Sequence, residues 1–227
     1  MNTASELIAY WRRCVLDTVK PYLWSDDDAL SYANDAYNMF VRLTGGIADF
    51  LSDAAAVNIV AGEATAELSP TILRIMSATR RSDNQPIEII NNTDLGKMRS
   101  SDYGQIKQLV LDALQGPVRY MVLGMQRDQV RWVQVPVVDD VCDMQIYRLP
   151  LEGLTNFEST LDEVAEEHRI HLVDWMSHLA YKKHDADAFD PRRSDAAAAA
   201  FQDYCKLSKA EWERYKHKRR VVNYGGL

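Results

Sequence analysis

The spacing of apolar residues changes twice along this 227-residue chain. In the first fifty or so residues, and again after residue 150, apolar side chains recur every three or four positions. That spacing places them on one face of a helix. Between these parts they alternate with polar residues or form short β-branched runs bounded by turn residues, which predicts strands. Because helices and strands are segregated along the chain, an α+β fold is favoured over a parallel α/β fold.

The two helical parts carry clear start and stop signals. Capping boxes begin at Thr3 and Ser25, and Pro21 and Gly45 end the two periodic runs that follow them. Near the C-terminus, one helix is predicted from Thr160 to about His184, and another begins at Asp190-Pro191, where proline suits the first helical position. We expect the N- and C-terminal helices to pack together as a helical bundle.

The middle of the chain is predicted to form six to seven short, mostly antiparallel strands inserted into that bundle, with a helix from Ser101 to Leu114 among them. The expected domain organisation has four parts: N-terminal helices over residues 1–55, a β-rich inserted domain over 56–150, C-terminal helices over 151–218, and an extended docking tail over 219–227.

Net charge, cysteine content and the length of apolar stretches disfavour some classes of partner and location. A net charge of −7 and a pI near 5.3 disfavour a specific duplex-binding protein, which would normally present a basic face. The three cysteines are far apart and odd in number, which is typical of reduced thiols in a cytoplasm. The chain has neither a signal sequence near its N-terminus nor an apolar stretch of ~18 residues, so we expect a soluble, unexported protein without a membrane partner.

Histidines supply the densest cluster of potential metal ligands. The cluster comprises His168, His171, His178, His184 and Asp185. The HExxH spacing is absent and no cysteine is nearby, so the alternative is that these histidines pack against or cap their helices. No phosphate-binding loop or nucleophile elbow occurs. We therefore predict no catalytic residue, metal or cofactor, and keep a metal-dependent helical hydrolase as the alternative function.

The last fourteen residues, RYKHKRRVVNYGGL, have an unusual composition for an acidic protein. Five basic side chains are followed by two valines, a tyrosine and two glycines. Three interpretations remain open: a segment that docks on a partner, a solvated helix end, or a basic patch that touches DNA.

Four stretches, taken in order, resemble the head-to-tail adaptor proteins of tailed bacteriophages, also called connector or tail-tubular-protein-A-like proteins. They are LWSDDDALSYANDA from Leu23, AGEATAELSP from Ala61, GPVRY from Gly116, and LVDWMSHLAYKKHDAD from Leu172. Each stretch alone is a weak signal, and the resemblance depends on their order. It spans nearly the whole chain.

The resemblance implies a structural virion protein rather than an enzyme. Such adaptors form a dodecameric ring beneath the portal protein, connect it to the next tail or nozzle protein, and extend the channel through which DNA is ejected. The implied location is the virion neck, after assembly in the host cytoplasm, with only non-specific contact to the passing DNA. A neck or tail-completion protein that does not touch the portal is the other alternative.

The same resemblance implies that the C-terminal segment reaches into the portal. Its basic side chains would meet an acidic portal surface, and its apolar side chains would bury in a groove or add to a sheet edge. The expected portal-binding residues are Arg214, Lys216, Lys218, Arg219, Arg220, Val221, Val222, Tyr224 and Leu227.

Overall fold

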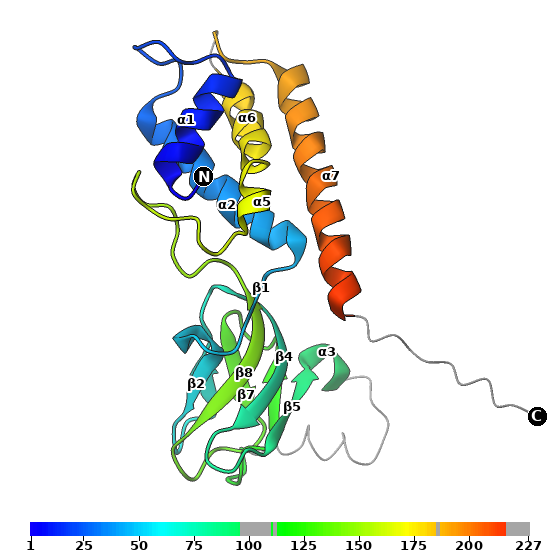
Figure 1. Cartoon of the computed structure of the whole chain (residues 1–227). Helices are drawn as coiled ribbons and strands as arrows, with labels where there is room; N and C mark the ends of the chain where they lie inside the picture. The colour runs from blue at the N-terminus through cyan, green and yellow to red at the C-terminus, as the bar shows by residue number, and fades with distance from the viewer. Residues whose placement is uncertain (96–109, 111–112, 185–186, 217–227) are drawn as a thin grey trace, which may run out of the picture. The chain divides into compact units, whose positions relative to one another are not determined.

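The computed structural model describes residues 1–95, 110, 113–184 and 187–216. The chain divides into two compact units (Figure 1). The helical unit comprises Met1–Gly46 and Glu152–Leu227, and the β unit comprises Ile47–Leu151. In the described part of the chain, no helix combines the length and the apolar character that crossing a membrane requires.

The helical unit contains α1 (Ala4–Cys14), α2 (Asp26–Thr44), the short α5 (Glu166–Arg169), α6 (Leu172–Lys182) and α7 (Pro191–Lys216). Both predicted N-terminal caps are confirmed. The Thr3 hydroxyl accepts the Glu6 amide, and Ser25 and Asp28 form a reciprocal capping box. Gly45, with φ of 102°, ends α2 in the left-handed conformation that a side chain disfavours.

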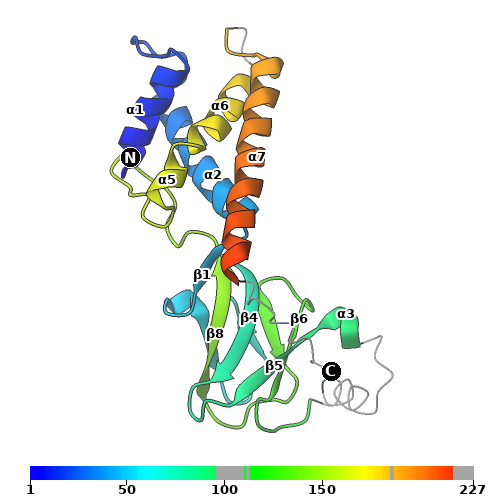
Figure 2. The same cartoon turned by 45° about the vertical axis from the view of Figure 1, so that its right-hand side comes forward.

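The helical bundle is the part of the fold prediction that is wrong, although the α+β class holds. Helix α6 packs against α1, α2 and α7, whereas the main partners of α1 are only α2 and α6 (Figure 2). The helices also differ greatly in length, from 4 residues in α5 and 11 in α1 and α6 to 26 in α7. An irregular segment completes the unit, because Phe157 and Ser159 accept backbone hydrogen bonds from the first turn of α1. Helices so unequal cannot share one continuous bundle seam.

Two helix boundaries also differ from the prediction. The first helix ends at Cys14 instead of continuing toward Pro21, because Leu16 takes a positive φ of 61° that a helix cannot accommodate. The helix predicted from Thr160 begins only at Glu166 and is divided into α5 and α6.

The described residues of the β unit form an eight-stranded sheet. Its strands are β1 (Ile47–Asp49), β2 (Ala56–Ile59), β3 (Thr65–Glu67), β4 (Ile72–Arg80), β5 (Pro86–Asn91), β6 (Tyr120–Leu123), β7 (Gln129–Trp132) and β8 (Asp140–Arg148), with the 3-10 turn η1 (Asp53–Ala55) before β2 and the short helix α3 (Asn92–Leu95) after β5. The strand order is β1-β8-β4-β5-β6-β7-β3, and β2 also pairs with β8.

This sheet is mixed and curled, although most of its strand pairings are antiparallel, as predicted. Strands β5 and β6 pair in parallel, which requires the long connection that lies between them, while the other pairings are antiparallel. Strand β2, which pairs with β8 near one end of the order, packs against β3 at the other end, so the sheet bends into a half-barrel. The helix predicted from Ser101 to Leu114 lies almost entirely outside the described residues.

The core of the β unit fills the inside of this curl. Buried side chains alternate along the strands, as in Val57 and Ile59 of β2 and Met144 and Ile146 of β8. Trp132, at the end of β7, is the largest member of the cluster. Burying one face of β2 and β8 fixes their register, because a shift of one residue would expose the whole buried set.

Candidate docking surface

Helix α7 is the longest described element, and its start is firmly capped. Asp190 accepts the backbone amides of Arg192 and Arg193 at 3.1 Å through the same carboxylate oxygen, and Pro191 occupies the first helical position. Its inner face buries Ser194, Phe201, Cys205 and Ser208 against the rest of the helical unit, where α6 and α2 are its main partners.

The inner face ends at Ser208, but the helix continues to Lys216. Every side chain from Lys209 to Arg214 is exposed, including Trp212, whose surface is 44% accessible. We call residues 209–216 the α7 arm. A large aromatic side chain on an exposed helical extension is typical of a contact surface for another chain.

The predicted portal-binding residues begin in this arm. Arg214 is exposed in α7, and Lys216 is the last residue of the helix. The other predicted residues lie outside the described part of the chain: Lys218, Arg219, Arg220, Val221, Val222, Tyr224 and Leu227. Their contribution to docking therefore stays a prediction.

The candidate metal ligands within the described residues contact other side chains of the helical unit. His168 lies 2.9 Å from the Tyr204 hydroxyl through Nδ1, and the ring of His171 stacks on the same tyrosine. His178 Nδ1 lies 2.9 Å from the Ser194 hydroxyl, which itself donates to the His178 carbonyl. These contacts join α5 and α6 to α7, so three of the histidines hold helices together.

His184 is exposed and stacks on Phe189, and Asp185 lies outside the described residues. Burial lowers the pKa of His171, so that ring favours its neutral form. Among the described residues, no three His, Cys, Asp or Glu side chains gather in an arrangement that suits a metal ion.

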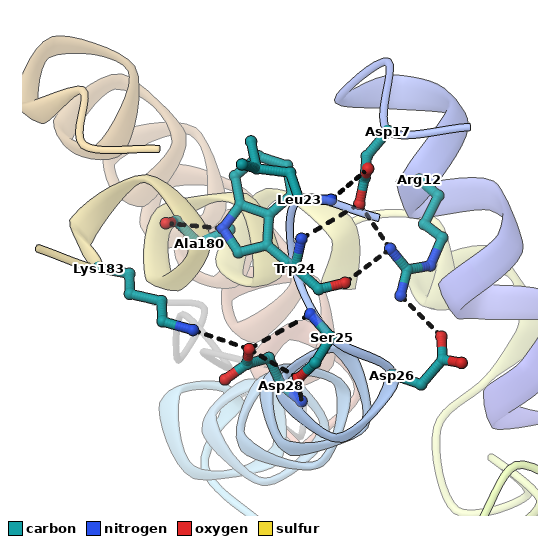
Figure 3. A network of polar contacts seen from close by, with 9 residues as sticks. All are labelled: Arg12, Asp17, Leu23, Trp24, Ser25, Asp26, Asp28, Ala180 and Lys183. Carbon is teal, nitrogen blue, oxygen red and sulfur yellow. Dashed lines mark hydrogen bonds and ion pairs between the residues drawn. The ribbon is translucent and has the colours of Figure 1, made fainter. Parts of the chain in front are cut away.

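A buried ion network holds the segment between α1 and α2 in the helical unit (Figure 3). The Arg12 guanidinium bonds Asp17 at 2.5 Å, Asp26 at 2.8 Å and the Trp24 carbonyl at 3.0 Å. Asp17 also accepts the backbone amide of Leu23 at 2.8 Å. A buried arginine is tolerated because its planar group is paired and hydrogen-bonded on several sides.

The same network reaches α6. The Trp24 indole donates to the Ala180 carbonyl at 3.2 Å, and Lys183 pairs with Asp28 at 2.8 Å (Figure 3). The hydrogen bond from Lys183 lowers the pKa of Asp28. The segment between α1 and α2 is therefore anchored to three helices.

This anchored segment presents apolar side chains to water. Leu16 is 87% exposed and Val19 is 77% exposed, and Leu23 is also exposed. The first helix was predicted to continue toward Pro21, which would place Val19 on its apolar inner face; that placement is wrong, because the helix ends at Cys14 and Val19 is exposed. Pro21, only two residues later, is the one local signal that the helix had already ended. Exposed aliphatic side chains on an anchored segment form a second candidate contact surface.

Comparison with known protein families identifies the family of this chain. The family model described as SU10 adaptor protein matches residues 2–221. No curated protein matches the chain. The matched range covers the described elements of both units, including the whole of α7.

Proposed function

We propose that this chain, which belongs to the SU10 adaptor protein family, is a structural adaptor that joins the head of a tailed bacteriophage to its tail. The family match extends over nearly the whole chain, so the adaptor role applies to both units together and not to one domain. The closer likeness to tail-tubular proteins stays a prediction from the sequence.

In this proposal the adaptor forms a dodecameric ring beneath the portal and extends the channel for the genome. A ring needs a heterologous contact, in which two different surfaces of each copy meet. The chain offers separated candidates for these surfaces, namely the α7 arm and the exposed side chains Leu16 and Val19. The virion neck is the corresponding location, with assembly in the host cytoplasm and the next tail or nozzle protein as the distal partner.

The observation that carries portal docking is the exposed α7 arm and the sequence that follows it. Arg214 begins a run of five basic residues that ends at Arg220 in a chain with a net charge of −7. Such a local reversal of charge would steer the segment toward an acidic portal surface. The apolar residues Val221, Val222 and Tyr224 would then bury on docking, and twelve copies would multiply a weak single contact.

An acidic protein also suits the wall of a DNA channel. Proteins bind the phosphates of DNA mainly through Lys and Arg side chains. A channel wall with few unpaired cations therefore binds DNA weakly and lets it pass. The proposal therefore includes only non-specific contact with the genome, and a structural rather than an enzymatic role.

The test is deletion of residues 219–227. Circular dichroism should be unchanged, whereas co-sedimentation with purified portal rings should be lost. Replacing Lys206 and Lys209 by Gln is the matched control, because both side chains are exposed on α7 but precede the basic run; this variant should still bind. If the deleted chain binds portal rings as well as the intact chain does, the docking role of the tail is wrong. A portal-independent neck protein becomes the better account if neither chain binds.

A further inference from the structure

The β unit contains a cavity of about 410 Å³ at one end of its curled sheet. Its walls come from the end of β2, the turn between β4 and β5, the stretch 116–118 before β6, and the loop 136–140 between β7 and β8. The volume falls in the range of roughly 300–1,000 Å³ that is usual for binding pockets. All the residues that line it belong to the β unit.

The cavity has an apolar floor and an apolar rim. Ile59 and Val118 are buried at its base. Val137 and Val138, in contrast, are 59% and 73% exposed at the β7–β8 loop. Adjacent valines exposed beside a cavity give it a surface on which aliphatic side chains of another chain can pack.

Acidic side chains outnumber basic ones in the described lining of the cavity. Among the described residues of the lining, Arg80 is the one basic side chain, and Asp83, Asp139 and Asp140 are acidic. The guanidinium of Arg80 is already engaged by Asp83, at 2.9 Å, and lies 3.9 Å from Asp140. The remaining carboxylate, Asp139, is exposed and accepts the Ala61 amide at 2.7 Å through Oδ1. In the part of the chain that the structure describes, Oδ2 of Asp139 has no hydrogen-bond donor.

The walls are held in place before any ligand arrives. The Ser82 hydroxyl donates to Asp140 at 2.6 Å, which ties the β4–β5 turn to the start of β8. The Gly62 amide donates to the Pro136 carbonyl at 2.9 Å, which fixes the β7–β8 loop. A preformed site loses less conformational entropy on binding than a flexible one.

We propose that this cavity binds the C-terminal segment Arg219–Leu227 of a second copy of the chain. The arginines of that segment match the exposed carboxylate of Asp139, and the two valines that follow match the exposed Val137 and Val138. Tail-to-cavity contact is heterologous, so it links one copy to the next. The inference goes beyond portal docking and needs no portal. Since both proposals use the same segment, portal rings should compete with the cavity for it.

A fluorescent peptide of residues 214–227, titrated with the full chain, tests recognition. Anisotropy should show binding that Asp139→Asn weakens by about three- to fivefold, as expected for loss of one partly exposed ion pair. Val138→Ser should weaken it as well. Glu67→Gln changes an exposed carboxylate elsewhere in the β unit and should have no effect. A peptide of the same composition in scrambled order should bind more weakly. Equal binding to all variants, equal binding of both peptides, or no binding would overturn the proposal.

Cross-linking between copies identifies the source of the segment. Full chains labelled with ¹⁴N and ¹⁵N are mixed and treated with a carbodiimide, which joins carboxylates to lysine amines. Mass spectrometry should find mixed-isotope peptides that join Asp139 to Lys216 or Lys218. Cross-links only within one isotope, or none at these residues, would contradict binding of a second copy. Portal binding that depends on the tail would still stand in that case, so failure here is separable from failure of the adaptor role.

Discussion

Arg12 Nη1 lies 2.5 Å from Asp17 Oδ2, and each side chain is only 6% exposed. This pair closes the end of α1, and Asp17 in turn holds the backbone of Leu23. These contacts hold the segment between α1 and α2 in place (Figure 3). Leu16 and Val19, which belong to this segment, are exposed.

Arg12→Met should lower the free energy of unfolding by about 3–5 kcal/mol, because it leaves Asp17 buried without its cation. Urea unfolding followed by tryptophan fluorescence measures the loss. Lys206→Met is the control, since Lys206 forms an exposed pair with Asp203 and should contribute under about 1 kcal/mol. Equal losses in the two variants would mean that the buried network does not stabilise the helical unit.

Stability should fall at acid pH through Asp49. Burial by itself raises the pKa of Asp49, but hydrogen bonds from Arg148 and Ser52 outweigh burial and hold that pKa well below the ordinary 3.8. The contribution is therefore complete above the unfolded pKa and is lost as pH falls below about 4 toward the lower folded pKa. Asp49→Asn should be less stable at pH 7 and lose less between pH 5 and 2. Asp53→Asn, at an exposed position, should follow the wild-type profile. Identical profiles for Asp49→Asn and wild type would contradict the assignment.

Thiol labelling should distinguish the three cysteines. Cys14 is exposed, whereas Cys142 and Cys205 are buried, and burial raises the pKa of both buried thiols to about 12. At pH 8 the native protein should react with one equivalent of a thiol reagent, and the urea-unfolded protein with three. Cys14→Ser should abolish the native reaction. Rapid reaction of a second thiol in that variant would mean that a buried cysteine is accessible.

Portal association should slow as salt rises, since screening weakens the attraction of the basic run. Stopped-flow mixing with portal rings measures the rate. A variant with Gln at Arg214, Lys216, Lys218, Arg219 and Arg220 should associate slowly and with little salt dependence. If the association rate of the wild type does not depend on salt, the basic residues do not steer the encounter and serve only to cap the C-terminal end of the helix.

Local signals in the sequence predicted the elements that local interactions determine. The caps at Thr3, Ser25 and Asp190 depend on neighbours three residues away, so the starts of α1, α2 and α7 followed from sequence. The end of α1 did not, because Arg12 meets Trp24 and Asp26 only after the chain has turned.

The pairing of strands that lie far apart in the chain could likewise not be predicted from the sequence. The parallel contact of Glu88 with Tyr120 joins residues on either side of a long connection, and no local pattern reports it. Of the predicted portal-binding residues, Arg214 is exposed in the described part of the chain. The exposed Leu16 and Val19 were missed because an apolar residue near a helix is normally assigned to the core.

The mass of the chain, alone and after mixing with purified portal rings, tests the adaptor role most directly. Native mass spectrometry should show a species that adds about twelve copies to each ring, as expected for closed symmetric assembly on a template. A small oligomer that keeps its mass in the presence of portal rings would contradict the adaptor role.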